Sequence, residues 1–190
     1  MKNFSRALPL TVLLFLSVQM MAQDTHIASH SLTVTIPEVA LLDIEPASNS
    51  VTLGATAPTE AGEPLDFTTA TNTALWLNYS SIIGTAPDNS RAITVSVAGT
   101  LPTGANLKVQ AGSYSGSGAG TTGTSAGLVT LAAVATDYSL VTGIGSCYTG
   151  DGESNGHQLT YSLTENTGSY ASLNFSTDYS LTVTYTLSDN

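Results

Sequence analysis

The chain has very few positively charged residues. Its 190 residues include four Lys and Arg against 14 Asp and Glu, which gives a formal net charge of -10 at pH 7. Lys2 and Arg6 lie at the extreme N-terminus, so only Arg91 and Lys108 remain beyond it. Nucleic acids and anionic membrane surfaces are bound through clustered cations. The composition therefore excludes a basic binding groove, and we expect no nucleic acid and no anionic membrane surface as a partner.

Cysteine is almost absent as well. Cys147 is the single cysteine, so no intrachain disulfide can form. Charged residues make up only 9% of the chain and hydrophobic residues 42%. Disordered chains combine high charge with low hydrophobicity, and this chain has neither property. We therefore expect a folded domain that is stabilised by packing and strand pairing alone. Cys147 should be buried or incidental, and an intermolecular bridge is the alternative.

Helical periodicity is also lacking beyond the N-terminus, and period-two alternation takes its place. In Leu181–Leu187 (LTVTYTL) hydrophobic residues alternate with threonine. Successive side chains of a strand point to opposite faces, so such a segment has one buried and one solvent-facing side. Segments of this kind, and short apolar runs bounded by turns, predict strands at 32–36, 39–44, 51–53, 75–83, 93–97, 107–111, 128–131, 138–144, 159–163 and 181–187.

Turns containing Pro, Gly, Asp or Asn separate these segments. The pattern predicts an all-β fold: a single antiparallel β-sandwich, immunoglobulin-like or pilin-like, with about nine or ten strands. The composition does not change along residues 38–190, so we assign them to one domain. Within it, residues 111–127 (AGSYSGSGAGTTGTSAG) are rich in Gly, Ser and Thr and are expected to form a flexible loop or a flexible hairpin tip.

The N-terminus has the three parts of a secretory signal peptide, which we place at residues 1–22. Two cations precede the apolar run Leu8–Val18, and the small residue Ala22 precedes the expected cleavage site. That run is shorter than the roughly 20 residues that a membrane-spanning helix needs. We expect a secreted chain with no membrane insertion after signal cleavage. An N-terminal arm or first strand then follows at residues 23–37.

Two motifs associated with catalysis or nucleotide binding occur in the Gly-rich segment. Residues 118–123 match the dinucleotide fingerprint GxGxxG, and residues 123–127 match the nucleophile elbow GxSxG. Both motifs act at a turn from a strand into a helix, and no helix is expected here. No pair of carboxylates lies in an apolar sequence setting suited to general acid–base catalysis. We therefore expect no enzyme, and a secreted hydrolase is the least favoured alternative.

The acidic segment 151–156 (DGESNG) has the pattern with which a calcium loop begins. Asp151, Glu153 and Asn155 place side-chain oxygens at alternate positions, and a glycine follows. Helical flanks are missing, and the twelfth position is Ser162 rather than a bidentate Glu. We expect a surface turn without a cofactor, and weak calcium binding is the alternative.

The only tryptophan lies in a strand-like segment that also contains Tyr79. Trp76 alternates out of phase with Leu75, Leu77 and Tyr79. Either Trp76 or these three residues should therefore face solvent, unless the strand is buried on both faces. Exposed aromatic rings on a β-face can stack on sugars. Trp76 and Tyr79 are thus the candidate carbohydrate contacts, although burial of the strand on both faces is the favoured interpretation.

The C-terminal sequence Thr182–Asp189 (TVTYTLSD) resembles the closing motif of WxL cell-wall-binding domains, with Tyr185 in the position of that family's tryptophan. The first WxL motif is not reproduced by residues 76–78 (WLN). This resemblance implies a secreted β-rich module that binds envelope or extracellular polysaccharide. The signal ending in residues 21–23 (MAQ) is similar to those of exported Bacteroidota proteins, which implies the periplasm or cell surface of a Gram-negative bacterium.

The same strand is similar to the ends of spore coat U proteins and of chaperone–usher pilin-like subunits. This second resemblance implies a non-catalytic, fimbrial-like subunit that polymerises when its N-terminal extension completes a neighbour's sheet. Residues 24–36 would be that extension, with Leu32, Val34 and Ile36 as plugging residues and Pro37 ending the strand. We expect a structural or adhesive protein of the cell surface or envelope. Its partners would be itself or other surface proteins, by strand addition, or else a polysaccharide.

Overall fold

The computed structural model describes residues 26–47, 50–175 and 179–190. Contacts divide the chain into two units, one ending at Thr35 and the other beginning at Ile36. The predicted signal peptide at residues 1–22 lies outside the described residues, and so do the first residues of the predicted arm.

Regular structure in the described residues is β-structure, apart from one short 3-10 turn at Tyr170–Ser172. The nine strands are β1 (Val39–Glu45), β2 (Thr71–Ile82), β3 (Arg91–Gly99), β4 (Ala105–Ser115), β5 (Ala119–Ser125), β6 (Leu128–Thr130), β7 (Tyr138–Tyr148), β8 (Gly156–Glu165) and β9 (Leu181–Asp189). The predicted all-β class is confirmed. In the part of the chain that is described, no helix is long and apolar enough to cross a bilayer.

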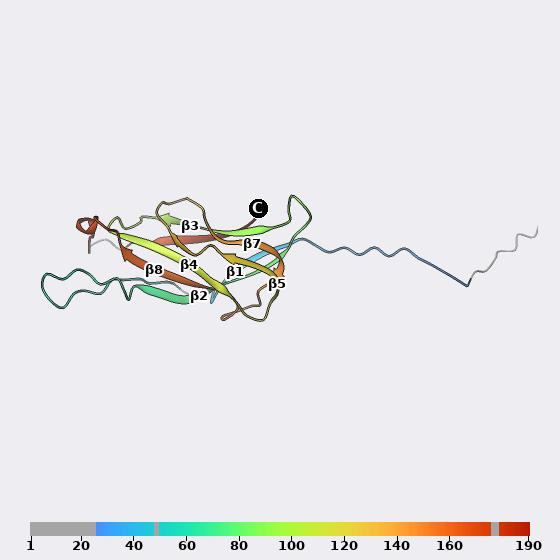
Figure 1. Ribbon diagram of the computed structural model, residues 1–190, viewed down its shortest axis with the longest axis horizontal. Coiled ribbons are helices and arrows are strands. Elements are labelled where there is room, and N and C mark those ends of the chain that lie inside the picture. The colour runs from blue at the N-terminus through green and yellow to red at the C-terminus, as the bar shows by residue number, and fades with distance from the viewer. Residues whose placement is uncertain (1–25, 48–49, 176–178) are drawn as a thin grey trace, which may run out of the picture. The chain divides into compact units, whose positions relative to one another are not determined.

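The strands form one antiparallel sheet with the order β6-β4-β8-β2-β7-β3-β9, and β1 and β5 pair beside this path with β2 and β7. The 12-residue strand β2 changes partner along its length. Its first half pairs with β8, whereas Ser80 and Ser81 pair with β7. β2 thereby joins two groups of strands, with β2, β4 and β8 lying on one side in Figure 1 and β3 on the other.

The sheet folds back on itself around a hydrophobic core. β8 and β9 are separated by three strands in the sheet order, yet the hydroxyl of Tyr161 on β8 is hydrogen-bonded to that of Tyr185 on β9. In β3, Ile93, Val95 and Val97 are 0%, 0% and 1% exposed, while the hydroxyl residues between them are half-buried. The alternation read from the sequence therefore separates core from solvent as predicted.

The segment 111–127 is not the flexible loop that its composition predicted. Its first residues complete β4, and Ala119–Ser125 form β5, which pairs with β7. A Cβ atom at Gly118 or Gly120 would collide with a backbone carbonyl of β7, and Gly120 also has a φ of +94°. Glycine is required here because it allows two backbones to approach closely and accepts a positive φ.

Two of the predicted strands are not formed. Residues 26–38 carry no strand, and neither do residues 51–53. Val51 and Leu53 nevertheless pack against the core as partly buried side chains. Alternation indicates which side chains of a segment would face the core and which would face solvent. A strand forms only where a neighbouring segment pairs with it by hydrogen bonds.

Candidate functional site

The N-terminal arm exposes its hydrophobic side chains. Leu32, Val34 and Ile36 are 79%, 75% and 75% exposed, and the threonines between them are exposed too. A continuous row of large exposed apolar residues is unusual on a soluble domain and marks an interaction surface. Pro37 follows directly and cannot donate a ladder hydrogen bond, so strand pairing would end there. The three predicted plugging residues are thus accessible.

β9 has an unpaired edge. It pairs with β3 from Leu181 to Asp189, and no other described strand pairs with it. Alternate residues of β9 therefore direct their N–H and C=O groups away from β3. The inward-facing side chains of β9 are only partly buried, namely Leu181, Val183, Tyr185 and Leu187. The corresponding row of β3 is fully buried, so the core is less well covered at β9.

The edge of β1 borders the same side of the core. β1 pairs only with β2 among the described strands, and its Cα atoms approach those of β9 within 8 Å. Leu42 and Ile44 on β1 pack against the core but stay partly exposed. The core-facing side chains of both β1 and β9 are therefore partly exposed to solvent.

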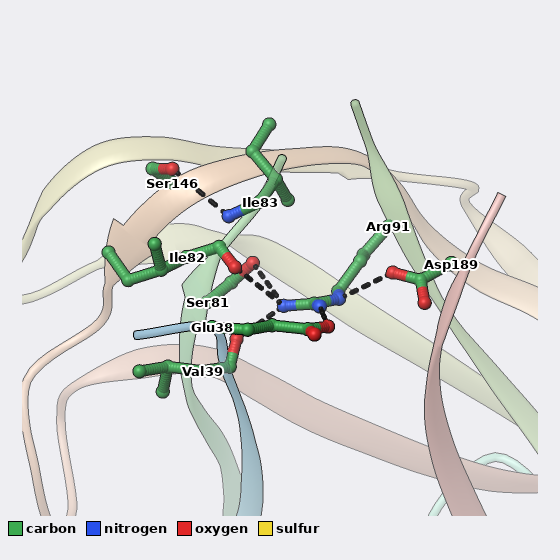
Figure 2. A network of polar contacts seen from close by, with 8 residues as sticks. All are labelled: Glu38, Val39, Ser81, Ile82, Ile83, Arg91, Ser146 and Asp189. Atoms are coloured by element: carbon green, nitrogen blue, oxygen red, sulfur yellow. Dashed lines mark hydrogen bonds and ion pairs between the residues drawn. The ribbon is translucent and has the colours of Figure 1, made fainter. Parts of the chain in front are cut away.

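A buried arginine joins strand ends beside these edges (Figure 2). Arg91, the first residue of β3, is 2% exposed. Its guanidinium donates hydrogen bonds to the backbone carbonyls of Val39 and Ile82 and to the Ser81 hydroxyl, the last two at 3.3 Å. The beginning of β1 and the end of β2 are therefore fixed to the beginning of β3.

Two carboxylates complete the surroundings of Arg91. Its Nε donates to Asp189 Oδ1 at 2.8 Å, and Glu38 Oε1 accepts from the same guanidinium. Glu38 is 71% exposed and Asp189 is 50% exposed, so water screens both ion pairs. Because Glu38 directly follows Pro37, the base of the arm lies next to the C-terminal end of β9. We call this arrangement, made by Arg91, Glu38, Val39, Ser81, Ile82 and Asp189, the Arg91 corner.

Sequence reasoning noted Arg91 only as one of few cations. The available signal was an arginine two residues before the alternating segment 93–97, in a chain that has almost no other cation to pair with its carboxylates. Its partners could not be inferred, because they lie far from it in the sequence.

The chemistry available to the arm and to the edge of β9 is strand pairing. Unpaired backbone groups run along β9, and an exposed arm carries an apolar row of the same period. No protein-family model, curated protein or solved structure matches the chain. Its function must therefore be inferred from this geometry.

Tyr79 is a core residue, which removes it as a candidate for carbohydrate contact. Its side chain is 3% exposed, and its hydroxyl donates to the Thr122 carbonyl and lies 2.8 Å from Nε2 of His157. The His157 ring stacks on Tyr79 with centroids 5.9 Å apart, and its Nδ1 lies 2.7 Å from the Gly112 carbonyl. Burial raises the pKa of the Tyr79 hydroxyl well above its usual range. These contacts bind β2, β4, β5 and β8 together inside the fold.

Trp76 lies on the opposite face of β2 from Tyr79. Positions an odd number apart on a strand face opposite ways, so the two aromatic residues cannot form one sugar platform. Trp76 is half-buried, between Glu45 on β1 and Gln158 on β8 as cross-strand neighbours. Because its ring lies on the outer face beside polar neighbours, Trp76 remains a candidate for carbohydrate contact.

The predicted calcium ligands lie in the turn between β7 and β8. Asp151 and Glu153 are exposed, whereas the Asn155 amide is used within the protein. Its Nδ2 donates to the Asp151 carbonyl at 2.7 Å, and its Oδ1 accepts from the Ser117 backbone at 3.2 Å. Within the described residues, no three His, Cys, Asp or Glu side chains are placed to hold a metal. Calcium binding here stays a prediction without support from the geometry.

Proposed function

We propose that the chain is a non-catalytic, exported structural subunit of the bacterial cell surface or envelope, with an immunoglobulin-like or pilin-like sandwich. It would join its neighbours by adding its arm as a strand to another sheet. The observation that carries the proposal is the exposed alternating row of Leu32, Val34 and Ile36.

The energetics of the arm support this function. Burying one large apolar side chain is worth about 1.5–3 kcal/mol, and all three of these side chains face water in the described chain. Pairing with an edge strand would bury that row and satisfy backbone hydrogen-bonding groups at the same time. The signal-like N-terminus and the scarcity of cations agree with an exported protein that does not bind nucleic acid.

A charge placed on each face of the arm tests the proposal. Leu32→Asp with Val34→Asp puts two carboxylates on the apolar face, and Thr33→Asp with Thr35→Asp puts the same charge on the other face. Sedimentation velocity of the processed protein should show assemblies for the wild type and the threonine variant, and monomers for the Leu32/Val34 variant. Equal sedimentation of the Leu32/Val34 variant and the wild type would show that the arm does not assemble the protein.

A polysaccharide-binding module is the second candidate, and the outer-face position of Trp76 favours it. Isothermal titration calorimetry with purified envelope glycans should show binding by the wild type, and Trp76→Ala should abolish it. Tyr148→Ala is the matched control, because Tyr148 is also aromatic and is 54% exposed elsewhere on the surface. Absence of binding by the wild type, or equal binding by both variants, contradicts this alternative.

A further inference from the structure

The outer face of the sheet places charged and polar side chains around Trp76. Glu45 on β1 and Gln158 on β8 lie directly opposite Trp76, one on each side. Residues paired in this way have Cβ atoms about 4.5–5.5 Å apart, so their side chains can contact the same ligand. Two positions further along β1, Asp43 lies opposite Asn78 of β2. The ring therefore has two carboxylates on its β1 side and an amide on its β8 side.

These two carboxylates are not neutralised by the protein. Within residues 26–47, 50–175 and 179–190, every ion pair belongs to Arg91. Lys108, the other cation beyond the N-terminus, lies on β4, which β8 separates from β2. Asp43 and Glu45 are two residues apart on one strand, so they face the same way with Cα atoms about 7 Å apart. Like charges at this spacing repel each other, and a positively charged ligand would remove the repulsion.

The Trp76 ring has a preference for the same charge. The face of an aromatic ring is negative and attracts cations, and tryptophan attracts them most strongly. Trp76 is half-buried, so its neighbours do not cover the ring completely. On the other side of the ring, Nε2 of Gln158 donates to the Thr73 carbonyl at 3.0 Å, and this amide offers a ligand its oxygen. The groups on both sides of the ring are therefore acceptors, which suits a ligand that carries N–H donors.

Asn78 provides independent evidence for a missing donor on this face. Its side chain is 4% exposed, and its Nδ2 donates to the Asn155 carbonyl at 2.6 Å. Its Oδ1 has no hydrogen-bond partner in the part of the chain that the structure describes. Buried polar groups are normally hydrogen-bonded, so such an atom requires an explanation. Because Asn78 lies opposite Asp43, a donor that reaches the Asp43 carboxylate also approaches this oxygen.

From these observations we infer that the outer face of β1, β2 and β8 binds a polysaccharide that carries free amino groups. The inference rests on the polysaccharide-binding candidate above and adds the chemical class of the sugar. Trp76 stacks on an amino-sugar ring, and Glu45 and Asp43 hold its ammonium groups. The same two carboxylates, on a chain with a net charge of -10, repel acidic glycans.

Isothermal titration calorimetry with two matched oligosaccharides tests the charge of the ligand. One is a glucosamine hexamer at about pH 5.5, where its amines are protonated, and the other is the same hexamer with every amine acetylated. The wild type should bind the free-amine hexamer at least about tenfold more tightly, as expected for one charge-assisted hydrogen bond. Asp43→Asn with Glu45→Gln should abolish this preference. Glu60→Gln with Glu63→Gln removes the same charge from the exposed loop before β2 and should retain it.

The other outcomes separate this inference from the function on which it rests. Equal binding of the two hexamers, or loss of the preference in both double variants, means that Asp43 and Glu45 do not recognise an amine. If Trp76→Ala binds the free-amine hexamer as the wild type does, the amines bind elsewhere and the inference is wrong. If neither hexamer binds but another envelope glycan binds through Trp76, the candidate function stands and only the class of sugar is wrong. If the wild type binds no glycan, the candidate function itself fails.

Discussion

Replacing Arg91 by alanine should destabilise the fold by about 3 kcal/mol, mainly through neutral groups rather than through the ion pairs. The guanidinium satisfies the carbonyls of Val39 and Ile82 and the hydroxyl of Ser81 at a position that is 2% exposed. Each such buried hydrogen bond contributes about 1 kcal/mol. For a domain of this size, the loss corresponds to a melting temperature lower by about 10 °C.

The two carboxylates should matter less than the arginine. Glu38 and Asp189 stay 71% and 50% exposed, and ion pairs of this kind are worth roughly 0–1 kcal/mol each. Glu38→Gln and Asp189→Asn should therefore each lower the free energy of unfolding by less than about 1 kcal/mol. Lys108→Ala removes one positive charge, as Arg91→Ala does, from a half-buried position on β4. It therefore serves as the matched control for Arg91→Ala.

Urea unfolding followed by the fluorescence of Trp76, the only tryptophan, measures all four variants in one assay. The expected order of destabilisation is Arg91→Ala well above Glu38→Gln and Asp189→Asn, with Lys108→Ala smallest. The reasoning is refuted if Arg91→Ala is no worse than Lys108→Ala. It is also refuted if Glu38→Gln costs as much as Arg91→Ala, because the ion pair would then dominate.

Three further outcomes are expected from buried hydroxyl and thiol groups. Tyr161→Phe and Tyr185→Phe should each cost about 1 kcal/mol, and the double variant should cost less than their sum, because they share one hydrogen bond. Burial raises the pKa of the hydroxyls of Tyr79, Tyr161 and Tyr185, so stability should be complete below pH 10 and fall as the pH rises above it. Absorbance at 295 nm should show these three hydroxyls ionising only as the protein unfolds. Burial also raises the pKa of the Cys147 thiol, so a thiol reagent at pH 8 should react slowly with the native protein and quickly in urea.

Alternation made the strand content predictable. In residues 93–97 and 181–187, every second side chain is apolar, and these segments became β3 and β9 with the apolar face inward. Residues 32–36 have the same pattern but no strand, because alternation does not supply a neighbour. Sequence could therefore identify the arm as strand-like, but only the fold shows that β9 lacks a neighbour of its own.

Long-range partners were beyond sequence reasoning. Glu38 and Asp189 lie 53 and 98 positions from Arg91, and nothing local indicates that the three meet. The case of Tyr79 was different, since its odd spacing from Trp76 already places the two rings on opposite faces and burial was the favoured interpretation. The error over residues 111–127 came from taking glycine to indicate a flexible backbone. In the structure, the missing side chain instead lets the backbone of this segment approach the backbone of β7 closely.

The Arg91 corner also determines how the folded domain would respond to tension. Glu38 and Asp189 hold the same guanidinium, so the points at which the chain enters and leaves the domain coincide. A pull applied between Glu38 and Asp189 is shared by this side chain and by the pairing of β1 with β2 and of β9 with β3. Because both points of attachment lie at this one corner, β1 would peel from β2, and β9 from β3, one hydrogen bond at a time. The two ion pairs are screened by water and would add little to the force at which the domain begins to extend.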